Sequence, residues 1–221
     1  MTVAASWREI RERVDDACHA AKRSPDEVTI VAVSKKHPAS AIREAVEAGA
    51  RDIGENYAQE LATKLAEIPD LPALRWHFIG RLQRNKAKLV AGKVALVHAV
   101  DSLELAQELA KRSPTRQPIL IAVNVAGEES KGGVGVDQAP ELARAISDVA
   151  NVRLDGLMTM PPADVDARPH FEALRTLRDR IRGELGAELP VLSMGMSGDF
   201  EAAIACGATH VRIGTAIFGA R

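Results

Sequence analysis

The sequence has very little cysteine, and this scarcity excludes several classes of protein. Among 221 residues, Cys18 and Cys206 are the only cysteines, and they form no C-x-x-C pair. Disulfide-stabilised secreted domains and structural zinc sites need more cysteines at closer spacing. The six histidines also lack an H-E-x-x-H or comparable metal-binding spacing. We therefore expect a reduced, cytoplasmic protein without a metal site.

Net charge and long apolar runs are also lacking. Lys and Arg number 29 against 30 for Asp and Glu, which leaves a net charge of -1. Nucleic acids and anionic membranes attract proteins through a positive field that this balance does not supply. No apolar stretch reaches the length of a membrane span, and the first residues lack the apolar run of a signal peptide. The sequence predicts neither a nucleic-acid partner nor a membrane partner.

What the chain does contain is a regular alternation of two patterns. Short β-rich runs alternate with segments rich in Ala, Leu, Glu and Arg, and no linker or charge block divides them. We therefore predict a single domain over residues 1–221. The predicted strands are Thr29–Lys35, Arg51–Asn56, Arg75–Gly80, Val94–Val100, Pro118–Val125, Val152–Met160, Val191–Gly195 and Thr209–Thr215. The helical segments include Ser40–Ala48, Leu103–Lys111, Pro140–Val149 and Pro169–Leu185.

The number of strands predicts the fold. Eight strands separated by seven helical patterns indicate an α/β fold with a parallel sheet, and eight strands close a TIM-type (β/α)8 barrel. An extra amphipathic helix precedes them and ends near Ser24-Pro25. Only six residues follow Thr215, so we expect no eighth helix there and expect the N-terminal helix to cover the gap. The alternative is an open doubly wound sheet, which usually starts with a strand and uses fewer of them.

One lysine lies where such barrels carry their active sites. Those sites lie at the carboxyl ends of the strands, and the first predicted strand ends with Lys35. If Val31 and Val33 point into the barrel, alternation places Lys35 inside and Lys36 outside. A lysine that loses hydration there has a lowered pKa and becomes nucleophilic towards an aldehyde. The alternative is a solvated surface charge beside Lys36 and His37.

The last two predicted strands are followed by residues that favour a phosphate. Ser197-Gly198 opens a helix, and Gly214-Thr215 ends the last strand. Loops after strands seven and eight often bind phosphate in barrels, through backbone N–H groups and hydroxyls. The alternative is that these residues only form turns. With Lys35, the pattern predicts an aldehyde that carries a phosphate, such as pyridoxal 5′-phosphate (PLP) or a phosphosugar.

Arg212 lies within the last predicted strand, where a lone buried cation is unfavourable without a partner. Two roles stay open from the sequence. Arg212 either forms a salt bridge at the base of the barrel or faces the ligand opposite Lys35. His210 precedes it at the start of the strand, the wrong end for a catalytic triad with Ser197, so a serine hydrolase is not expected.

Taken together, these motifs resemble those of the PLP homeostasis proteins, a family also described as YggS/PROSC-like. The resemblance runs in family order from the first strand to the last residues. The matching stretches are Ala32-Val-Ser-Lys35, Gly54-Glu-Asn-Tyr-Ala-Gln-Glu60, Trp76-His-Phe-Ile-Gly80, Leu82-Gln-x-Asn-Lys86, Ser130-Lys-x-Gly133, Gly156-Leu-Met158, Ser193-Met-Gly-Met-Ser197-x-Asp199 and Val211-Arg-Ile-Gly-Thr-Ala-Ile-Phe-Gly219.

The resemblance implies a barrel like the N-terminal domain of alanine racemase, the type III fold of PLP proteins. It further implies PLP held as a Schiff base on Lys35, with phosphate contacts from Ser197 and from the backbone of Gly214-Thr215. Arg212 would face the pyridine nitrogen, and Asn56 would lie near the ring.

Within this resemblance, a carrier is favoured over a catalyst. A guanidinium at the pyridine nitrogen keeps its proton, so the ring nitrogen stays neutral and the cofactor is a weak electron sink. Racemases that resemble this barrel take a second base, a tyrosine, from another domain, whereas the sole tyrosine here is Tyr57. We expect a monomer that delivers PLP to PLP-dependent apoenzymes. A small amino-acid racemase is the alternative, and a phosphosugar aldolase or isomerase is a third possibility.

Overall fold

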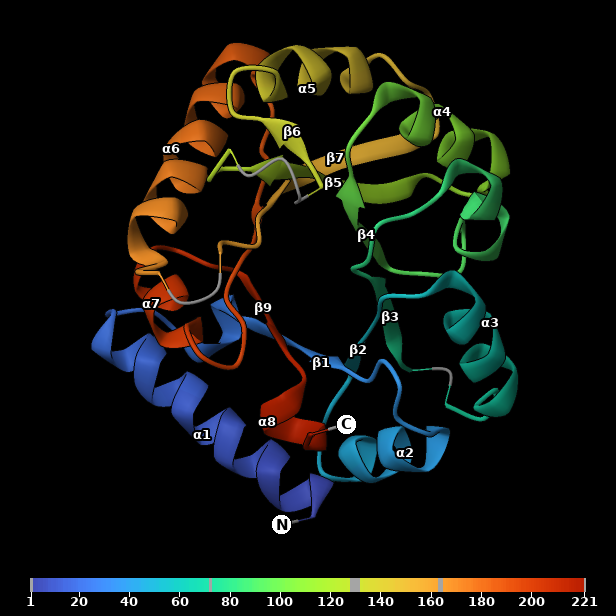
Figure 1. Ribbon diagram of the computed structural model, residues 1–221, viewed down its shortest axis with the longest axis vertical. Coiled ribbons are helices and arrows are strands. Elements are labelled where there is room, and N and C mark those ends of the chain that lie inside the picture. Colours follow the sequence, from blue (N-terminus) through green and yellow to red (C-terminus); the bar gives the residue numbers. More distant parts are fainter. Residues whose placement is uncertain (1, 72, 128–131, 163–164, 221) are drawn as a thin grey trace.

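Eight parallel strands close into a barrel, which confirms the predicted fold class. The computed structural model describes residues 2–71, 73–127, 132–162 and 165–220. Its sheet runs in the order β4-β3-β2-β1-β9-β8-β7-β5-β6, and pairing between β4 and β5 closes it (Figure 1). The strands are β1 (Thr29–Val33), β2 (Asp52–Glu55), β3 (Arg75–Phe78), β4 (Leu96–Val100), β5 (Gln117–Asn124), β6 (Val134–Gly135), β7 (Val152–Met158), β8 (Val191–Ser193) and β9 (His210–Ile213). The two-residue β6 extends the end of β5 and lies outside the ring of eight.

Helices form a ring around these strands (Figure 1). The helices are α1 (Val3–Ala20), α2 (Ala39–Glu47), α3 (Ala58–Glu67), α4 (Leu103–Arg112), α5 (Ala139–Ser147), α6 (Arg168–Leu185), α7 (Phe200–Ala205) and α8 (Thr215–Phe218). Among the described residues, η1 (Pro25–Glu27) and η2 (Arg84–Leu89) are 3-10 helices. Each connection between neighbouring barrel strands is helical as predicted, although the one from β3 to β4 is the 3-10 helix η2. A 3-10 turn rises further per residue than an α-helix, which suits so short a connection.

The two ends of the described chain meet in the outer ring. Helix α1 packs against α2, α7 and α8, so it covers the gap between the last helix and the first, as predicted. Its buried face includes Trp7, Ile10 and Val14 of the expected amphipathic stripe, together with Cys18. The expectation of no helix after the last strand is wrong, because α8 forms one turn there. The four residues of α8 form only one helical turn, and α1 occupies the place of the full helix that would otherwise follow β9.

Strand alternation separates two cores. Most buried apolar side chains lie between the strands and the helices. A second, smaller cluster comprises Leu96, Ala99, Leu120, Ala122, Met158 and Val191. A register shift between Val97 and Val100 accompanies the inward position of Ala99, which lines a cavity at the barrel mouth. Buried polar side chains fill much of the remaining interior, including those of His77, His98 and Arg212.

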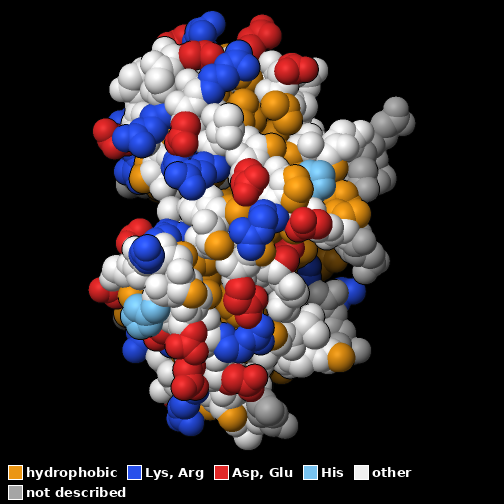
Figure 2. All heavy atoms as spheres, turned by 90° about the vertical axis from the view of Figure 1, so that its left-hand side faces the viewer, with side chains coloured by type: hydrophobic (Ala, Val, Ile, Leu, Met, Phe, Trp, Pro, Cys, Tyr) orange, Lys and Arg blue, Asp and Glu red, His pale blue; other side chains and the backbone are white. Residues whose placement is uncertain are grey.

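Charges of both signs are interspersed on the outer surface. Figure 2 shows Lys and Arg side chains alternating with Asp and Glu over the face that α1, α6 and α7 form. Several belong to exposed ion pairs, such as Arg13 with Glu201 and Arg180 with Glu184. Such pairs contribute little to stability, but they leave this face without a field of one sign. No helix of the described residues is long and apolar enough to cross a membrane.

Candidate functional site

A cavity of about 420 Å3 opens at the carboxyl ends of the barrel strands. Loops after β1, β2, β8 and β9 all contribute to its lining. This is the end of the barrel at which such folds bind ligands. The structure brings together all six residues that the sequence singled out, because the lining includes Lys35, Asn56, Ser197, Arg212, Gly214 and Thr215.

Lys35 reaches the cavity from a turn rather than from the strand itself. Strand β1 ends at Val33, two residues earlier than predicted, because Lys35 and Lys36 form a turn that a bond from His37 N–H to Ser34 O closes. The predicted alternation nevertheless continues past the strand end. Val33 and Lys35 line the cavity, whereas Lys36 is exposed and has a φ of 65°. The backbone N–H of Lys36 donates to Glu60 Oε1 at 2.5 Å, which holds this left-handed residue in place.

A buried ion cluster outside the barrel supports the Lys35 turn from below. Lys64 on α3 donates all three of its Nζ hydrogens, to Ser34 O at 2.7 Å, Glu55 Oε1 at 2.6 Å and Glu60 Oε1 at 2.8 Å. Ser34 Oγ also donates to Glu55 Oε1. Burial raises the pKa of the Glu55 carboxyl, while its bonds to Lys64 and Ser34 act in the opposite direction. The cluster ties the residue before Lys35 to α3, so the backbone under Lys35 is fixed by several bonds at once.

The expected phosphate-binding turn is folded by its own side chains. Asp199 Oδ1 accepts the N–H of Met196 at 2.6 Å, and the N–H of Asp199 donates back to Met196 O at 3.2 Å. Ser197 Oγ accepts from Ala216 N at 3.4 Å, which joins this turn to the start of α8. A Cβ built on Gly198 would meet no atom within 4 Å. The backbone of Gly198 is therefore open to a ligand.

A glycine also fixes the approach of this turn to helix α7. Gly195 has a φ of 93°, and an added Cβ would lie 2.6 Å from Ala203 Cβ. A side chain there would be strained in conformation and would push the turn away from α7. The residue type at position 195 thus sets the distance between the turn and the helix that carries it.

Arg212 points into the barrel and lines the same cavity as Lys35. Its NH1 group donates to Ser193 Oγ at 2.7 Å and its NH2 group to Thr159 O at 2.8 Å. In the described part of the chain no carboxylate lies within ion-pair distance of it, so the alternative of a salt bridge at the base is wrong. Burial lowers the pKa of Arg212 to about 10, and Asp199 partly opposes this shift. The guanidinium still carries its charge at pH 7.

Asn56 presents an unsatisfied acceptor at the cavity. Its Oδ1 atom is buried without a hydrogen-bond partner among the described residues. Buried polar atoms are nearly always bonded, so an orphaned one at a cavity wall fits a ligand that supplies a donor. Gly80 packs directly behind it, since an added Cβ there would lie 2.1 Å from Asn56 O. The motif around Gly80 therefore serves to let the Asn56 backbone approach β3.

Several lining residues were missed by sequence reasoning. Asp101 and Arg81 lie at the cavity wall, as do Met158 and Met160. Asp101 directly follows the predicted strand Val94–Val100, so the strand-end rule could have found it. Tyr57 is half exposed and lines a neighbouring groove instead of the cavity. The motif residues Ser130 and Lys131 lie outside the described residues.

The comparison with known proteins decides the family. Residues 8–221 match the family described as "Alanine racemase, N-terminal domain". The pyridoxal phosphate homeostasis protein of Pseudomonas aeruginosa is 46% identical over 223 residues, which cover all of this chain and 96% of that protein. The chain belongs to the pyridoxal phosphate homeostasis protein family. The family membership that the motifs indicated is thereby confirmed.

Solved structures agree with this family at the level of the fold. The structure of PipY from Synechococcus elongatus with PLP bound matches with a TM-score of 0.82 and 34% identity, over 93% of this chain and 100% of that one. Alanine racemase from Corynebacterium glutamicum matches with a TM-score of 0.75 at 17% identity. It covers 97% of this chain but only 59% of the racemase. The second match shows the shared barrel and carries no argument about activity.

Proposed function

We propose that this family member binds PLP in the mouth cavity, covalently through Lys35, and serves intracellular PLP homeostasis by holding and delivering the cofactor. One observation carries the proposal. An amine at Lys35, a guanidinium at Arg212 and the turn around Ser197 face a single cavity of about 420 Å3. The PLP-bound relative PipY and the homeostasis proteins at 43–46% identity support the same ligand.

The residues present fit the chemistry of this cofactor. When bound, PLP supplies an aldehyde that condenses with an amine, a pyridine nitrogen that accepts a hydrogen bond, and a phosphate dianion. Lys35 provides the amine. Ser197, Gly214 and Thr215 offer a hydroxyl and backbone N–H groups of the kind that bind phosphate. Asn56 Oδ1, which has no partner among the described residues, offers an acceptor beside the ring.

The lining favours a carrier over a racemase. The titratable side chains among the described lining residues are Lys35, Arg81, Asp101 and Arg212, and the sole tyrosine lies outside the cavity. Arg212 keeps its proton at pH 7 because its pKa stays near 10. A hydrogen bond from a cation that does not release its proton leaves the ring nitrogen neutral, which weakens the stabilisation of a carbanion. Release of the cofactor needs only exchange of Lys35 for another amine.

The first experiment asks where PLP is held. Purified protein is incubated with PLP, reduced with borohydride and digested, and the peptides are identified by mass spectrometry. We expect one stoichiometric adduct on the peptide that contains Lys35, and a visible absorbance band before reduction. An adduct spread over surface lysines would contradict the proposal. Absence of the band with binding of phosphosugars would favour an aldolase or isomerase.

A second experiment separates carrier from racemase. Loaded protein is mixed with an apo-PLP enzyme, and recovery of that enzyme's activity is followed beside a free-PLP control. In parallel, chiral analysis follows alanine and other amino acids over long incubation. We expect transfer, and racemisation no faster than with free PLP. Sustained turnover that is lost in Lys35→Ala would establish the racemase instead.

We also propose a cytoplasmic location and a monomeric state. Cys18 and Cys206 are both buried free thiols, and burial raises the pKa of each. Such inert, reduced thiols support a cytoplasmic location. The mixed charges on the face in Figure 2 support a monomer that meets its acceptor apoenzymes transiently. Light scattering at several protein concentrations tests the assembly state.

A further inference from the structure

We propose that a column of side chains, Asp52, His77, His98 and Ser193, holds Arg212 from the closed base of the barrel and fixes which of its hydrogens face the cavity. These four residues are positioning residues, since none of them lines the cavity. The part of this inference that concerns PLP rests on the function proposed above. The part that concerns the hydrogen-bond order of the column stands without it.

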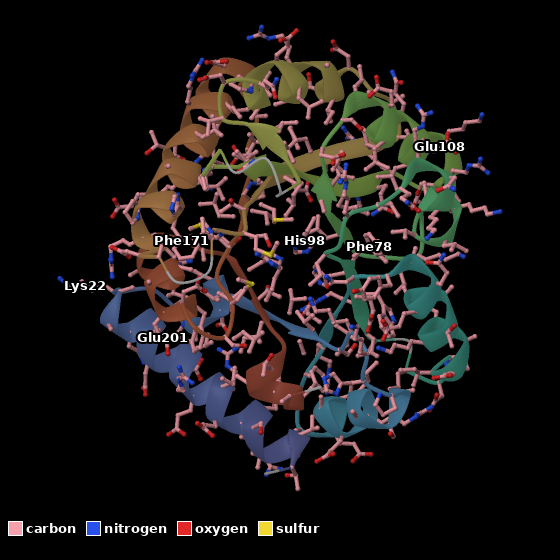
Figure 3. The ribbon with its side chains drawn as sticks, viewed as in Figure 1. Lys22, Phe78, His98, Glu108, Phe171 and Glu201 are labelled. Atoms are coloured by element: carbon pink, nitrogen blue, oxygen red, sulfur yellow. The ribbon has the colours of Figure 1, made fainter. Side chains whose placement is uncertain are left out.

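The column is continuous from the base of the barrel to the cavity. Asp52 Oδ1 lies 2.9 Å from His77 Nε2, and His77 Nδ1 lies 2.9 Å from His98 Nε2. His98 Nδ1 lies 2.8 Å from Ser193 Oγ, which is 2.7 Å from Arg212 NH1. At the lower end Arg75, whose side chain is 60% exposed, binds both oxygens of Asp52. Figure 3 shows His98 inside the ring of strands, whereas Glu108 points away from α4 on the outside.

With both imidazoles neutral, the chemistry of the two ends sets the direction of every bond between them. A guanidinium can only donate, so Ser193 Oγ accepts from Arg212. The Ser193 hydroxyl then donates to His98 Nδ1, and His98 Nε2–H donates to His77 Nδ1. His77 Nε2–H finally donates to the carboxylate of Asp52, which can only accept. All the hydrogen bonds therefore point from Arg212 to Asp52, and both imidazoles carry their hydrogen on Nε2.

Burial favours this arrangement over its rival. If His77 carried two hydrogens, His98 would turn into a donor to Ser193. Ser193 is fully buried and contacts no polar side chain but His98 and Arg212 among the described residues, so its own hydrogen would lack an acceptor. Such an orphaned donor is costly. Burial also holds the pKa of His98 well below its ordinary value, and the charged Arg212 acts in the same direction, which keeps this ring neutral.

This order gives the buried guanidinium a partner in place of a carboxylate. A chain of hydrogen bonds that all point one way polarises each member in the same sense, and the effect is larger in a low dielectric. Ser193 Oγ is thereby a stronger acceptor for Arg212 than an isolated hydroxyl. Thr159 O takes a hydrogen from NH2, so the two bonds together fix the plane of the guanidinium. The remaining hydrogens of Arg212 are left for the cavity.

The decisive measurement uses the ligand-free protein. Nitrogen-15 NMR of histidine-labelled protein reports which ring nitrogen of each imidazole is protonated. We expect His77 and His98 as neutral tautomers with the hydrogen on Nε2 at pH 7, assigned with single His→Gln variants at the other four positions. A doubly protonated His77, or a hydrogen on Nδ1 of His98, would contradict the proposed order of hydrogen bonds in the column.

Two substitutions then test its effect on the cavity. Ser193→Ala removes the acceptor of Arg212, and we expect about tenfold weaker PLP binding and a shifted absorption band of the bound cofactor. Asp52→Asn preserves shape at the far end but removes the charge, and we expect a change of about threefold in the same direction together with altered His77 and His98 signals. Ser193→Thr, which retains the hydroxyl, should restore the wild-type band.

A matched control separates this role from general packing. Ser113 is another buried serine, and its hydroxyl donates to Thr115 O at 2.6 Å outside the cavity. Ser113→Ala should leave PLP affinity and the absorption band unchanged. Wild-type affinity and an unshifted band in both Ser193→Ala and Asp52→Asn would refute the proposal. If wild-type protein forms no PLP adduct, the proposed function fails. The histidine tautomers measured by NMR in the ligand-free protein still test the proposed hydrogen-bond order of the column.

Discussion

The two ends of the barrel use charged residues in opposite ways. At the base, Asp52 is bound by both Arg75 and His77, so its hydrogen-bonding capacity is used within the protein. At the mouth, Lys35 and Arg212 line an open cavity, and Asn56 Oδ1 has no partner among the described residues. Paired groups at the base contribute stability, whereas groups at the mouth are arranged for a ligand. Substitutions at the mouth should therefore change binding, and substitutions of paired charges should change stability.

The largest effect is expected at the mouth. Lys35→Ala removes the only amine that the alternation directs into the cavity, so we expect complete loss of the visible band and of the borohydride-fixed adduct. Lys36→Ala, next in the chain but exposed, is the matched control and should retain most of both. Thermal unfolding should differ little between the two variants. A full reducible adduct in Lys35→Ala would disprove the assignment of the anchor.

The next effect tests the support beneath the mouth. Lys64→Ala leaves Glu55 buried without its cation, so we expect a loss of about 3–5 kcal/mol in the free energy of unfolding. Arg43→Ala breaks the exposed pair with Asp70 and should change stability little. Urea denaturation of both variants measures the difference. Equal stabilities would show that the cluster under Lys35 is solvated in solution.

Lowering the pH should reduce the free energy of unfolding through two groups at the base of the barrel, His210 and Asp52. Burial lowers the pKa of His210 from 6.5 to about 3, so protons bind the unfolded state first and stability falls as pH drops below about 6.5. Arg75 and His77 lower the pKa of Asp52 from 3.8 to about 2 against its burial. The Asp52 carboxylate thereby contributes about 2 kcal/mol to the free energy of unfolding. This contribution is present above pH 3.8 and is lost as the pH falls towards 2.

The measurement is urea denaturation at several pH values between 7 and 2. Asp52→Asn should lower stability at pH 7 and flatten the pH dependence below about 4, where the wild-type carboxylate takes up its proton. An unchanged slope in that variant would show that Asp52 is not the group that titrates.

The last prediction concerns the phosphate. Ser197→Ala should weaken PLP binding by about 1–3 kcal/mol, because a hydroxyl bond to a charged phosphate is lost. Pyridoxal, which lacks the phosphate, should bind wild-type protein much more weakly than PLP and should bind both proteins alike. Titrations followed by absorbance give the four affinities. Equal affinity of wild-type protein for pyridoxal and PLP would show that the turns around Ser197 and Gly214 do not bind the phosphate.

Sequence reasoning succeeded where a local pattern has a direct spatial meaning. Period-two alternation along β1 correctly directed Lys35 inward and Lys36 outward, even though the strand itself ends at Val33. The turn that begins at Ser34 was missed; a local bond from His37 N–H to Ser34 O closes it, and Lys64 and Glu60, distant in sequence, add bonds to its backbone. Asp101 was missed although it also follows a strand, since nothing in its neighbourhood marked it as a ligand residue.

The sequence by itself determined the barrel, the helix that completes its outer ring and six of the residues at its mouth, because periodicity and strand ends are local properties. Only the tertiary structure decided how Arg212 is held. Asp52, His77, His98 and Ser193 come from four different strands, β2, β3, β4 and β8. They meet because closure of the sheet turns their side chains toward one axis, and their hydrogen bonds cross intervals that no local pattern spans.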